Sequence, residues 1–353
     1  MTPGRAHGKG PDMKALAAAP RLIALLTVAL FVLAWSARAE DVASFFSGKM
    51  LKIIVGMPPG GGADAYARLV QRHLPGRLPG APSIMVQNVP GAGSLKSVVY
   101  LDALPDDGTA MDTFSSGLLT EALISPERVK IDFRKYAWIG NVSEDVRVCY
   151  LWHTAGVRNW QDLLAHDQVI FGASAAGTAG NVETAMLRDL FGVKIKEVEG
   201  YPGSADKRLA VEKGEVEGDC AGWTSLPEDW LRDGKINVIV RLSPTLLPGM
   251  DPKIPFAGDL LKTERDRQLF DFLMAPEKLG RLFMVSGRVP AERVAALRKA
   301  FDATVADPAF LRDAEKLRLT VTPMSGEEVA RDVAALYAAP QDVVAKAKAI
   351  AGE

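Results

Sequence analysis

The chain has 353 residues, of which 48% are hydrophobic and 24% are charged. These fractions are typical of a soluble globular protein with a sizeable core, and the length allows one large domain or two lobes. A formal net charge of −1 gives no general attraction for a polyanion, so we expect no nucleic-acid partner.

Residues 1–39 carry the features of a secretory signal peptide. The basic residues Lys14 and Arg21 precede an apolar run over 22–35, which is too short to span a bilayer comfortably. The run is followed by Ala37-Arg38-Ala39, which has small residues at the two positions that a signal peptidase reads. We therefore expect export to the periplasm with cleavage near Ala39, and a short N-terminal anchor is the alternative.

This N-terminal segment also affects the choice of the initiating methionine and the net charge of the mature chain. Met13 is a better candidate start than Met1, and it would make residues 1–12 a misassigned extension. Cleavage after Ala39 would remove five basic residues and one acidic residue, which leaves a net charge of −5. A chain with that charge must hold any anionic ligand through local groups.

The two cysteines, Cys149 and Cys220, each lie in an apolar run with the character of a strand. Export makes a disulfide possible, but two cysteines are too few to suggest a disulfide framework. Buried cysteine also behaves as a small hydrophobic residue. We expect two buried free thiols, with a disulfide as the alternative.

After the N-terminal segment, the chain repeats one unit three times: an apolar strand, a loop of small residues and a helix. The expected strands are Leu51–Gly56, Ile84–Gln87 and Ala110–Phe114. The loops after them are 58–63, Asn88–Gly93 and Ser115-Ser116-Gly117, and we expect helices from Asp64 and from Ser94.

A long apolar strand, Arg147–Trp152, precedes a second set of such units. Asn159 is expected to cap a short helix. The further expected elements are the strand Val169–Gly172, the loop Ala173–Gly180, the helix Asn181–Phe191, the strands Ile195–Val198 and Val216–Cys220, and the long strand Ile236–Leu242. The remainder is mostly helical, and Ser325 with Glu328 predicts a capping box for a helix that ends near Ala338.

Two sets of units joined by two long strands predict an α/β protein of two lobes, each with a mainly parallel sheet flanked by helices. The expected first lobe is 40–147 with 245–353, and the expected second lobe is 148–244. Ligands of open parallel sheets bind beyond the carboxyl ends of the strands. We therefore expect a ligand cleft where the loops of the two lobes face each other.

The loop Pro58-Pro59-Gly60-Gly61-Gly62-Ala63-Asp64 gives the strongest functional signal. Its glycines let the backbone approach a ligand closely, and the helix that follows offers unpaired N–H groups and a partial positive charge. We predict a carboxylate site that includes Pro59, Gly60, Gly61 and Asp64, with Asp64 as the helix cap. A purely structural turn is the alternative. The loop has neither the Lys-Ser/Thr of a P-loop nor a G-x-G-x-x-G pattern.

Other candidate ligand-binding residues stand at equivalent places after strands. Ser115 and Ser116 follow the third strand, and Gly177 and Thr178 lie in the second-lobe loop. Trp223 follows a strand end, where it either forms a wall of the site or belongs to the core. A role in building the loops is the alternative for the loop residues.

Neither a catalytic nor a metal-binding constellation is present in the sequence. Beyond the N-terminal segment the only histidines are His73, His153 and His166, and none has a metal-ligand spacing or neighbours a nucleophile elbow. We expect no enzyme activity and no cofactor.

In these loops the chain resembles the substrate-binding receptors of tripartite tricarboxylate transporters, the Bug receptors. The matching passages run in order along nearly the whole mature chain: Val55–Arg68, Asn88–Gly93, Ser115–Gly117 with Asp132-Phe133 and Ile139-Gly140, Gly172–Gly180, and Tyr201-x-Gly203 with Gly214-Glu215-Val216. The C-terminal Asp307-Pro308 and the segment Pro323–Glu328 match as well.

The resemblance implies a type II periplasmic-binding-protein fold that closes on a small carboxylate, either a dicarboxylate or an aromatic acid. It implies membrane permease subunits as partners and a monomeric receptor, and it adds Tyr201 to the candidate site. Met57, Ala63 and Val89 depart from the family pattern, as does the stretch 217–223. A ligand-sensing module for a signalling partner and a small periplasmic enzyme are the alternative functions.

The cleft loops contain no basic residue, and Arg68 falls at least one turn into its helix. We therefore expect Arg68 to point away from the cleft. We also expect loop backbone and hydroxyl groups to hold the carboxylate, without a salt bridge to arginine or lysine.

Overall fold

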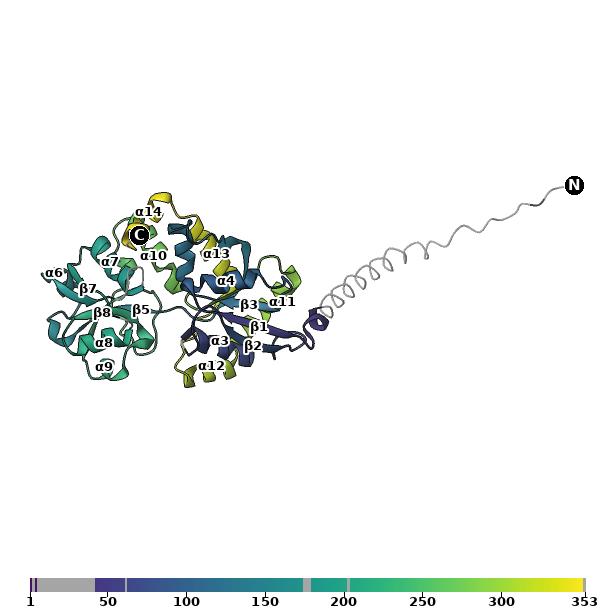
Figure 1. Cartoon of the computed structure of the whole chain (residues 1–353), viewed down its shortest axis with the longest axis horizontal. Helices are drawn as coiled ribbons and strands as arrows, with labels where there is room; N and C mark the ends of the chain where they lie inside the picture. Colours follow the sequence, from purple (N-terminus) through teal and green to yellow (C-terminus); the bar gives the residue numbers. More distant parts are fainter. Residues whose placement is uncertain (2–3, 5–41, 61, 174–178, 202–203, 352–353) are drawn as a thin grey trace.

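The chain folds into two β-sheets, each flanked by helices, as the computed structural model in Figure 1 shows. The structure describes residues 1, 4, 42–60, 62–173, 179–201 and 204–351. The expected signal peptide, Gly61, Gly177 and Thr178 lie outside the described residues. No helix among the described residues is long and apolar enough to cross a membrane.

The first sheet has six strands in the order β11-β4-β10-β3-β1-β2. Their bounds are β1 Met50–Val55, β2 Ser83–Asn88, β3 Ala110–Thr113, β4 Tyr136–Asn141, β10 Leu282–Ser286 and β11 Met324–Ser325. The helices around it are α3 Gly62–His73, α4 Leu95–Asp102, α5 Gly117–Ile124, α10 Glu264–Lys278, α11 Ala291–Val305, α12 Pro308–Lys316, α13 Gly326–Tyr337 and α14 Gln341–Ile350. We call this sheet and its helices the first lobe.

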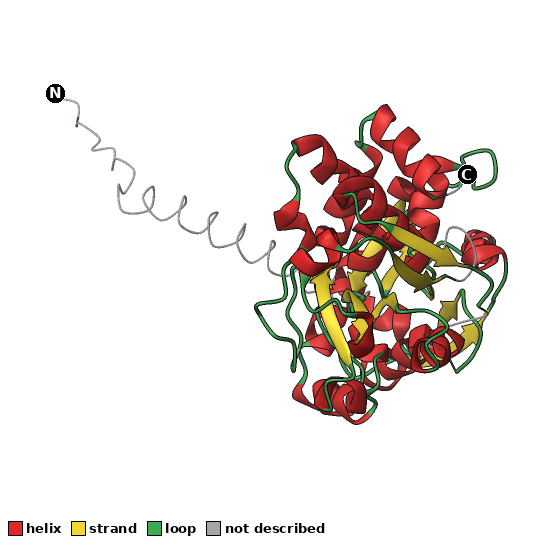
Figure 2. Ribbon diagram, turned by 90° about the vertical axis from the view of Figure 1, so that its left-hand side faces the viewer, coloured by secondary structure: helices red, strands yellow, loops and turns green. Residues whose placement is uncertain are grey.

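The second sheet has five strands in the order β7-β6-β8-β5-β9, and with its helices it forms the second lobe. The strands are β5 Arg147–Trp152, β6 Val169–Gly172, β7 Ile195–Val198, β8 Gly218–Gly222 and β9 Ile236–Arg241. The helices are α6 Trp160–Ala165, α7 Ala179–Phe191, α8 Ser204–Glu212 and α9 Glu228–Arg232. Figure 2 shows helices packed around both sheets.

Most strands in each sheet run in one direction, which agrees with the predicted α/β fold class. Strand β10 is antiparallel to β3 and β4, and β11 is antiparallel to β4. In the second sheet β5 alone runs against its neighbours β8 and β9. Strand β5 is reversed because the chain enters the second lobe at the carboxyl edge of the sheet, so its first strand must run away from that edge.

Several local expectations are confirmed, and helix starts differ by a turn or less. The Ser325 capping box is present, and Asn159 caps α6 by accepting from the N–H of Asp162. Helix α3 begins at Gly62, two residues before the expected start, so Asp64 lies inside the first turn. Similarly, α7 begins at Ala179, where the loop was expected to continue to Gly180.

The expectation of two free thiols is wrong, because Cys149 and Cys220 form a disulfide. The two residues stand directly opposite each other in the antiparallel pair β5–β8, with their Cα atoms 4.0 Å apart. Sequence alone shows two apolar runs, and only their pairing and register bring the sulfur atoms together. The bond joins the strand that leaves the crossing between the lobes to the strand beside it.

Helices from both lobes pack together on one side of the molecule. Helices α10 and α14 contact both α5 of the first lobe and α7 of the second. Accordingly, Phe114, Met186, Phe270 and Ile350 belong to one continuous cluster of buried side chains. In Figure 1 α10 and α14 lie over the junction of the lobes, beside the C-terminus.

Candidate functional site

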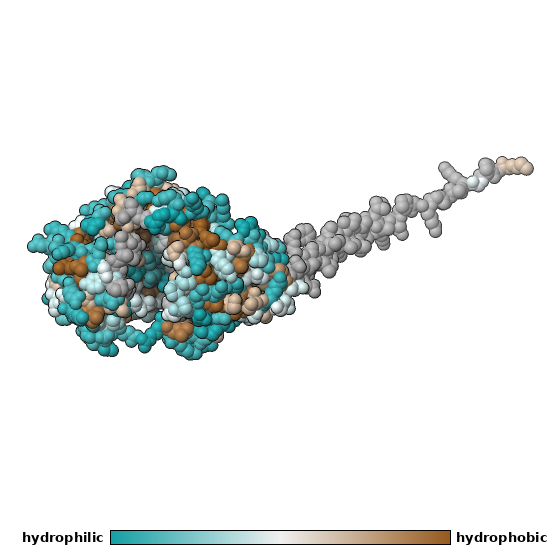
Figure 3. Space-filling view, viewed as in Figure 1, coloured by the Kyte–Doolittle hydropathy of each residue, from teal (hydrophilic) through white to brown (hydrophobic). Residues whose placement is uncertain are grey.

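The carboxyl edges of the two sheets meet at the crossing between the lobes. Strands β1, β2 and β3 are parallel, so they end at one edge of the first sheet, and β4 ends there too. Only residues 142–146 separate β4 from β5, and β5 begins opposite Gly222, the last residue of β8. Ligands of open α/β sheets bind at such edges. Figure 3 shows the surface hollowed between the two lobes.

The Gly-rich loop after β1 is held in shape by the buried carboxylate of Asp64. One oxygen accepts from the Gly60 N–H and from the Arg68 Nε, each at 2.9 Å, and the other accepts from the Asn88 Nδ2 at 3.0 Å. The hydrogen bond from Arg68 lowers the pKa of Asp64 to about 2, although burial acts in the opposite direction. Gly60 has φ +83°, a conformation that suits glycine.

These contacts show that Asp64 and Arg68 bind each other and the loop. We predicted Asp64 as a helix cap within the ligand site, and it does accept a backbone N–H, but it does so from inside the helix. One of its oxygens accepts from Gly60 and Arg68 and the other from Asn88, so Asp64 shapes the loop and is a poorer candidate for contacting the ligand. Arg68 pairs with Asp64 at 2.9 Å, which leaves its charge compensated.

Ser94 joins the ends of β1 and β3 to the loop after β2. Its hydroxyl donates to the Gly56 carbonyl at 3.0 Å and accepts the Ser115 N–H at 3.0 Å. A side chain on Gly56 would not fit, because its Cβ would stand 2.6 Å from the Ser94 Cβ. Ser94 therefore links the three first-lobe loops into one unit. The sequence predicted that these loops lie side by side, but it did not show which residue joins them.

Ser115 and Ser116 stand at the N-terminus of α5, as predicted, but only one of their hydroxyl groups is available. The Ser116 hydroxyl donates to the Pro276 carbonyl at 2.6 Å, which ties α5 to α10. The Ser115 hydroxyl has no hydrogen-bond partner among the described residues, and its side chain is half-buried. Ser115 is thus the better candidate for a ligand contact through its side chain.

Of the two second-lobe candidates that the structure describes, Tyr201 lies at the strand edge and Trp223 lies in the core. The half-buried Tyr201 packs beside Gly172, and its ring carbon lies 3.4 Å from where a Gly172 Cβ would stand. Trp223 is buried in the second-lobe core, near Val146, Leu247 and Met250, which favours the core alternative. Tyr201 therefore stands at the carboxyl edge of β6, where a ligand contact remains a prediction.

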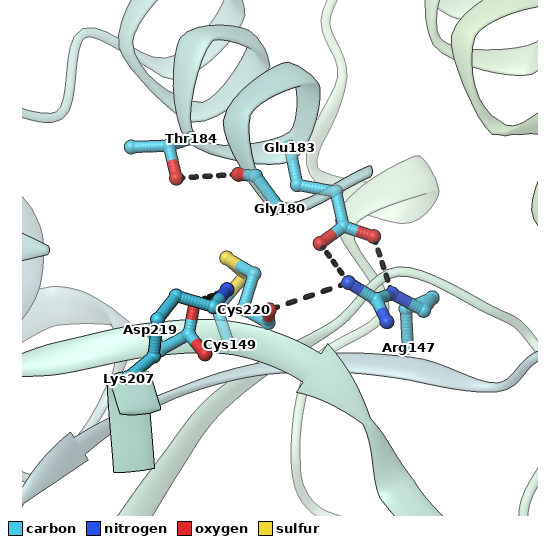
Figure 4. Close-up of a disulfide and its surroundings, with 8 residues drawn as sticks. All are labelled: Arg147, Cys149, Gly180, Glu183, Thr184, Lys207, Asp219 and Cys220. Carbon is cyan, nitrogen blue, oxygen red and sulfur yellow. Dashed lines mark hydrogen bonds and ion pairs between the residues drawn. A yellow bond between two sulfur atoms is a disulfide. The ribbon is translucent and has the colours of Figure 1, made fainter. Parts of the chain in front are cut away.

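Two buried ion pairs lie under the start of α7 (Figure 4). Arg147 donates to Glu183 through its Nε at 2.6 Å and its Nη2 at 2.8 Å. Lys207 Nζ stands 2.6 Å from the Asp219 Oδ1, with 6% and 1% of the two side chains exposed. Burial raises the pKa of Asp219 to about 6, although Lys207 acts in the opposite direction. Each cation of this region has a carboxylate beside it.

Arg281 is a basic residue of the cleft edge that the sequence analysis missed. It immediately precedes β10, whose first residue pairs with the last residue of β4. Its Nη2 lies 3.6 Å from the position that a Gly62 Cβ would take, so the guanidinium stands beside the first turn of α3. A signal was available in the sequence, since Arg281 directly precedes the apolar run 282–285.

A cavity of about 1000 Å³ lies between α10, α13 and the second crossing at 242–245, and none of the predicted site residues that the structure describes lines it. Among the described residues, no group of three or more His, Cys, Asp and Glu side chains could hold a metal ion.

No protein-family model and no curated protein sequence matches the chain. Solved structures do match its fold. The chain is 18% identical to a ligand-free TctC solute-binding protein from Polaromonas, with a TM-score of 0.69 over 86% of this chain and 97% of that chain.

Two further structures are similar. An adipate-bound protein of R. palustris, Rpa4515, is 18% identical, with a TM-score of 0.60 over 85% of this chain and 97% of that one. MatC from Rhodopseudomonas palustris with bound malate is 16% identical, with a TM-score of 0.56 over 86% and 99% of the two chains. The chain therefore has the two-lobed fold of periplasmic solute-binding proteins, as the sequence resemblance predicted.

Proposed function

We propose that the protein is an extracytoplasmic solute-binding receptor that captures a small carboxylate for a tripartite tricarboxylate-type transporter. The observation that carries the proposal is the meeting of the two carboxyl edges across residues 142–146, with α3, α5 and α7 all beginning there. Each helix start offers N–H groups without intrahelical partners and a partial positive charge. The three starts together form a site suited to an anion.

The ligand class follows from the chemistry of this edge and from the neighbours. Backbone N–H groups and the Ser115 hydroxyl are donors, which suits an acceptor such as a carboxylate. Adipate and malate, bound by two of the structural neighbours, are both small dicarboxylates. A dicarboxylate is therefore preferred here over an aromatic acid. We also propose a periplasmic location, membrane permease subunits as partners and a monomeric receptor.

The crossing between the lobes suits a receptor that opens and closes. Two segments join the sheets, 142–146 and the stretch after β9, so the lobes can rotate about these crossings, with α10 and α14 packed against both lobes on one side. Our predicted lobes, 40–147 with 245–353 and 148–244, stay part of the proposal, with the second lobe extended to include Arg147, which opens β5, and Leu247 and Met250, which pack in the second-lobe core. A ligand held by loops from both edges would favour the closed arrangement.

The rival functions make different predictions. An enzyme would need an acid–base pair or a nucleophile at the carboxyl edges, and the groups that the described residues place there are backbone amides, hydroxyls, paired charges and the guanidinium of Arg281. A sensor module would bind the ligand in the same way and pass the bound state to a signalling partner. The two binding functions differ in their partner and share the site.

The test is a binding panel of malate, succinate, adipate, benzoate and terephthalate against purified protein. We expect at least one compound to raise the melting temperature, because a ligand at a hundredfold excess over its dissociation constant stabilises by about 2.7 kcal/mol. Mass spectrometry of the recovered ligand should show it unaltered. A chemically altered ligand would overturn the receptor function in favour of an enzyme, and silence across the panel would overturn the proposed carboxylate class.

A further inference from the structure

We propose that Arg281 is the cation that receives a ligand carboxylate at the first turn of α3, which makes it the principal determinant of preference for an anionic ligand. The inference rests on the proposed function and deepens it. It keeps the backbone groups that the sequence predicted but replaces the expectation that no arginine or lysine contacts the ligand, and it assigns the anchoring point to the first lobe.

The position of Arg281 is set by two elements at the cleft edge. It stands directly before β10, and its main-chain N–H donates to the Asn141 Oδ1 at 2.8 Å, at the end of β4. Its guanidinium lies over the Tyr66 ring, with its Cζ 5.5 Å from the centroid. Its Nη2 approaches Gly62, which opens α3 and has no side chain to stand in between. Helix start and guanidinium thus converge on one place.

The hydrogen-bonding capacity of Arg281 is largely unused. A guanidinium has five N–H donors, and Nη1 spends one on the Gly280 carbonyl at 2.6 Å. The Nε atom is buried without a hydrogen-bond partner. No carboxylate forms an ion pair with Arg281 in the part of the chain that the structure describes. A buried donor without a partner is costly, and a bidentate carboxylate is the group that a guanidinium fork fits best.

The other cations near the cleft differ from Arg281 in this respect. Arg68, Arg147 and Lys207 pair with Asp64, Glu183 and Asp219, respectively. Glu277 also lies in the field of Arg281, but burial raises the pKa of that carboxyl to about 8 and so favours its neutral form. A ligand carboxylate would compensate the charge of Arg281.

The experiment measures the dissociation constants of malate, succinate, adipate, benzoate and terephthalate for wild type and for Arg281→Gln, Arg281→Lys and Arg293→Gln. Arg293 is the matched control, because it also stacks on an aromatic ring, that of Phe45, and donates to a carbonyl, that of Asp107. Asp107 precedes β3, so Arg293 lies at the opposite edge of the same sheet from the cleft. Melting temperatures of the unliganded variants report on folding.

For every compound that wild type binds, we expect Arg281→Gln to weaken binding about 10- to 100-fold, as for the loss of a charged hydrogen bond. Arg281→Lys should retain part of the affinity, because the charge remains while the planar fork is lost. Arg293→Gln should bind within twofold of wild type.

Three results would overturn the inference. If wild type binds and Arg281→Gln binds within twofold of it, the proposed function stands and the role of Arg281 fails. If the Gln and Lys variants lose affinity equally, with equally lowered melting temperatures, Arg281 supports Tyr66 and does not contact ligand. If wild type binds none of the panel, the proposed function fails, and the inference fails with it.

Discussion

The two lobes present their carboxyl edges to the same cleft but build them in different ways. In the first lobe, the loops consist mainly of residues with small side chains. They are cross-linked by the Asp64 carboxylate and the Ser94 hydroxyl. In the second lobe, the start of α7 lies on two buried ion pairs and beside a disulfide. Among the described cations named at the cleft, Arg281 of the first lobe has no carboxylate partner, whereas Arg147 and Lys207 of the second lobe are each paired.

From this difference we expect the two lobes to have different roles in ligand binding. The first lobe offers hydrogen-bond donors and, at the cleft edge, the unpaired charge of Arg281, so we expect it to capture the anion first. The second lobe, with paired charges under the start of α7, then closes over the bound ligand. Four further predictions separate the two lobes, and they are ordered by the expected size of the effect.

The largest effect is expected at the buried pair in the second lobe. Glu183→Gln removes the bidentate partner of the buried Arg147 and leaves it a longer ion pair with Asp145, at 3.8 Å. Removing one partner of a buried pair costs roughly 3–5 kcal/mol, so we expect a loss of about 3 kcal/mol in the free energy of unfolding. Urea denaturation measures it. Asp233→Asn, which breaks an exposed pair with Arg232, should cost less than about 1 kcal/mol, and equal losses would contradict the account.

The disulfide should contribute the next largest share of second-lobe stability. Its cysteines are 71 residues apart in sequence, and the double substitution Cys149→Ala with Cys220→Ala should lower the free energy of unfolding by about 2–4 kcal/mol. A reductant should lower wild type to a similar stability and leave the double variant unchanged. If reductant has no effect on wild type, the sulfur atoms are free thiols, as the sequence alone suggested.

A smaller and pH-dependent effect is expected at Asp64 in the first lobe. Its pKa in the folded protein is lowered to about 2 by Arg68, so its contribution to stability is present above its ordinary pKa of 3.8 and is lost as the pH falls toward 2. Asp64→Asn should cost about 1–2 kcal/mol at pH 7, because Arg68 is partly exposed. The difference from wild type should shrink between pH 4 and pH 2. A difference independent of pH would contradict the assignment.

The smallest effect concerns the second-lobe loop. Thr178 lies outside the described residues, and the sequence predicts that its hydroxyl donates to the ligand. Thr178→Ala should weaken binding by about 1 kcal/mol, or roughly fivefold in the dissociation constant. Thr184 is the matched control on α7, because its hydroxyl already donates to the Gly180 carbonyl at 2.7 Å. Thr184→Ala should change the melting temperature and leave affinity unaltered.

The sequence was sufficient for the fold class, because strand, loop and helix alternate with clear punctuation at glycine, serine and proline. It placed Pro59, Gly60, Ser115 and Ser116 at one sheet edge, since parallel strands end together. It could not show the disulfide or the place of the Arg281 guanidinium beside the first turn of α3. Both depend on strands from distant parts of the chain meeting in a particular register, which local pattern does not encode.

The role of Asp64 shows the same limit at a finer scale. Its type and place predicted a helix cap, but two acceptor oxygens can serve either a ligand site or the loop itself. Only the positions of Gly60, Arg68 and Asn88 decide between these uses, and two of those contacts come from side chains that the loop motif does not include. Similarly, Trp223 follows a strand end, yet its neighbours place it in the core.

The most direct test of the central claim is small-angle X-ray scattering with and without a saturating carboxylate from the binding panel. The account predicts that the ligand draws the two lobes together about residues 142–146, so the radius of gyration should fall on binding. Arg293→Gln should show the same compaction. A radius of gyration that stays constant while the carboxylate is bound would contradict closure of the two edges on the ligand.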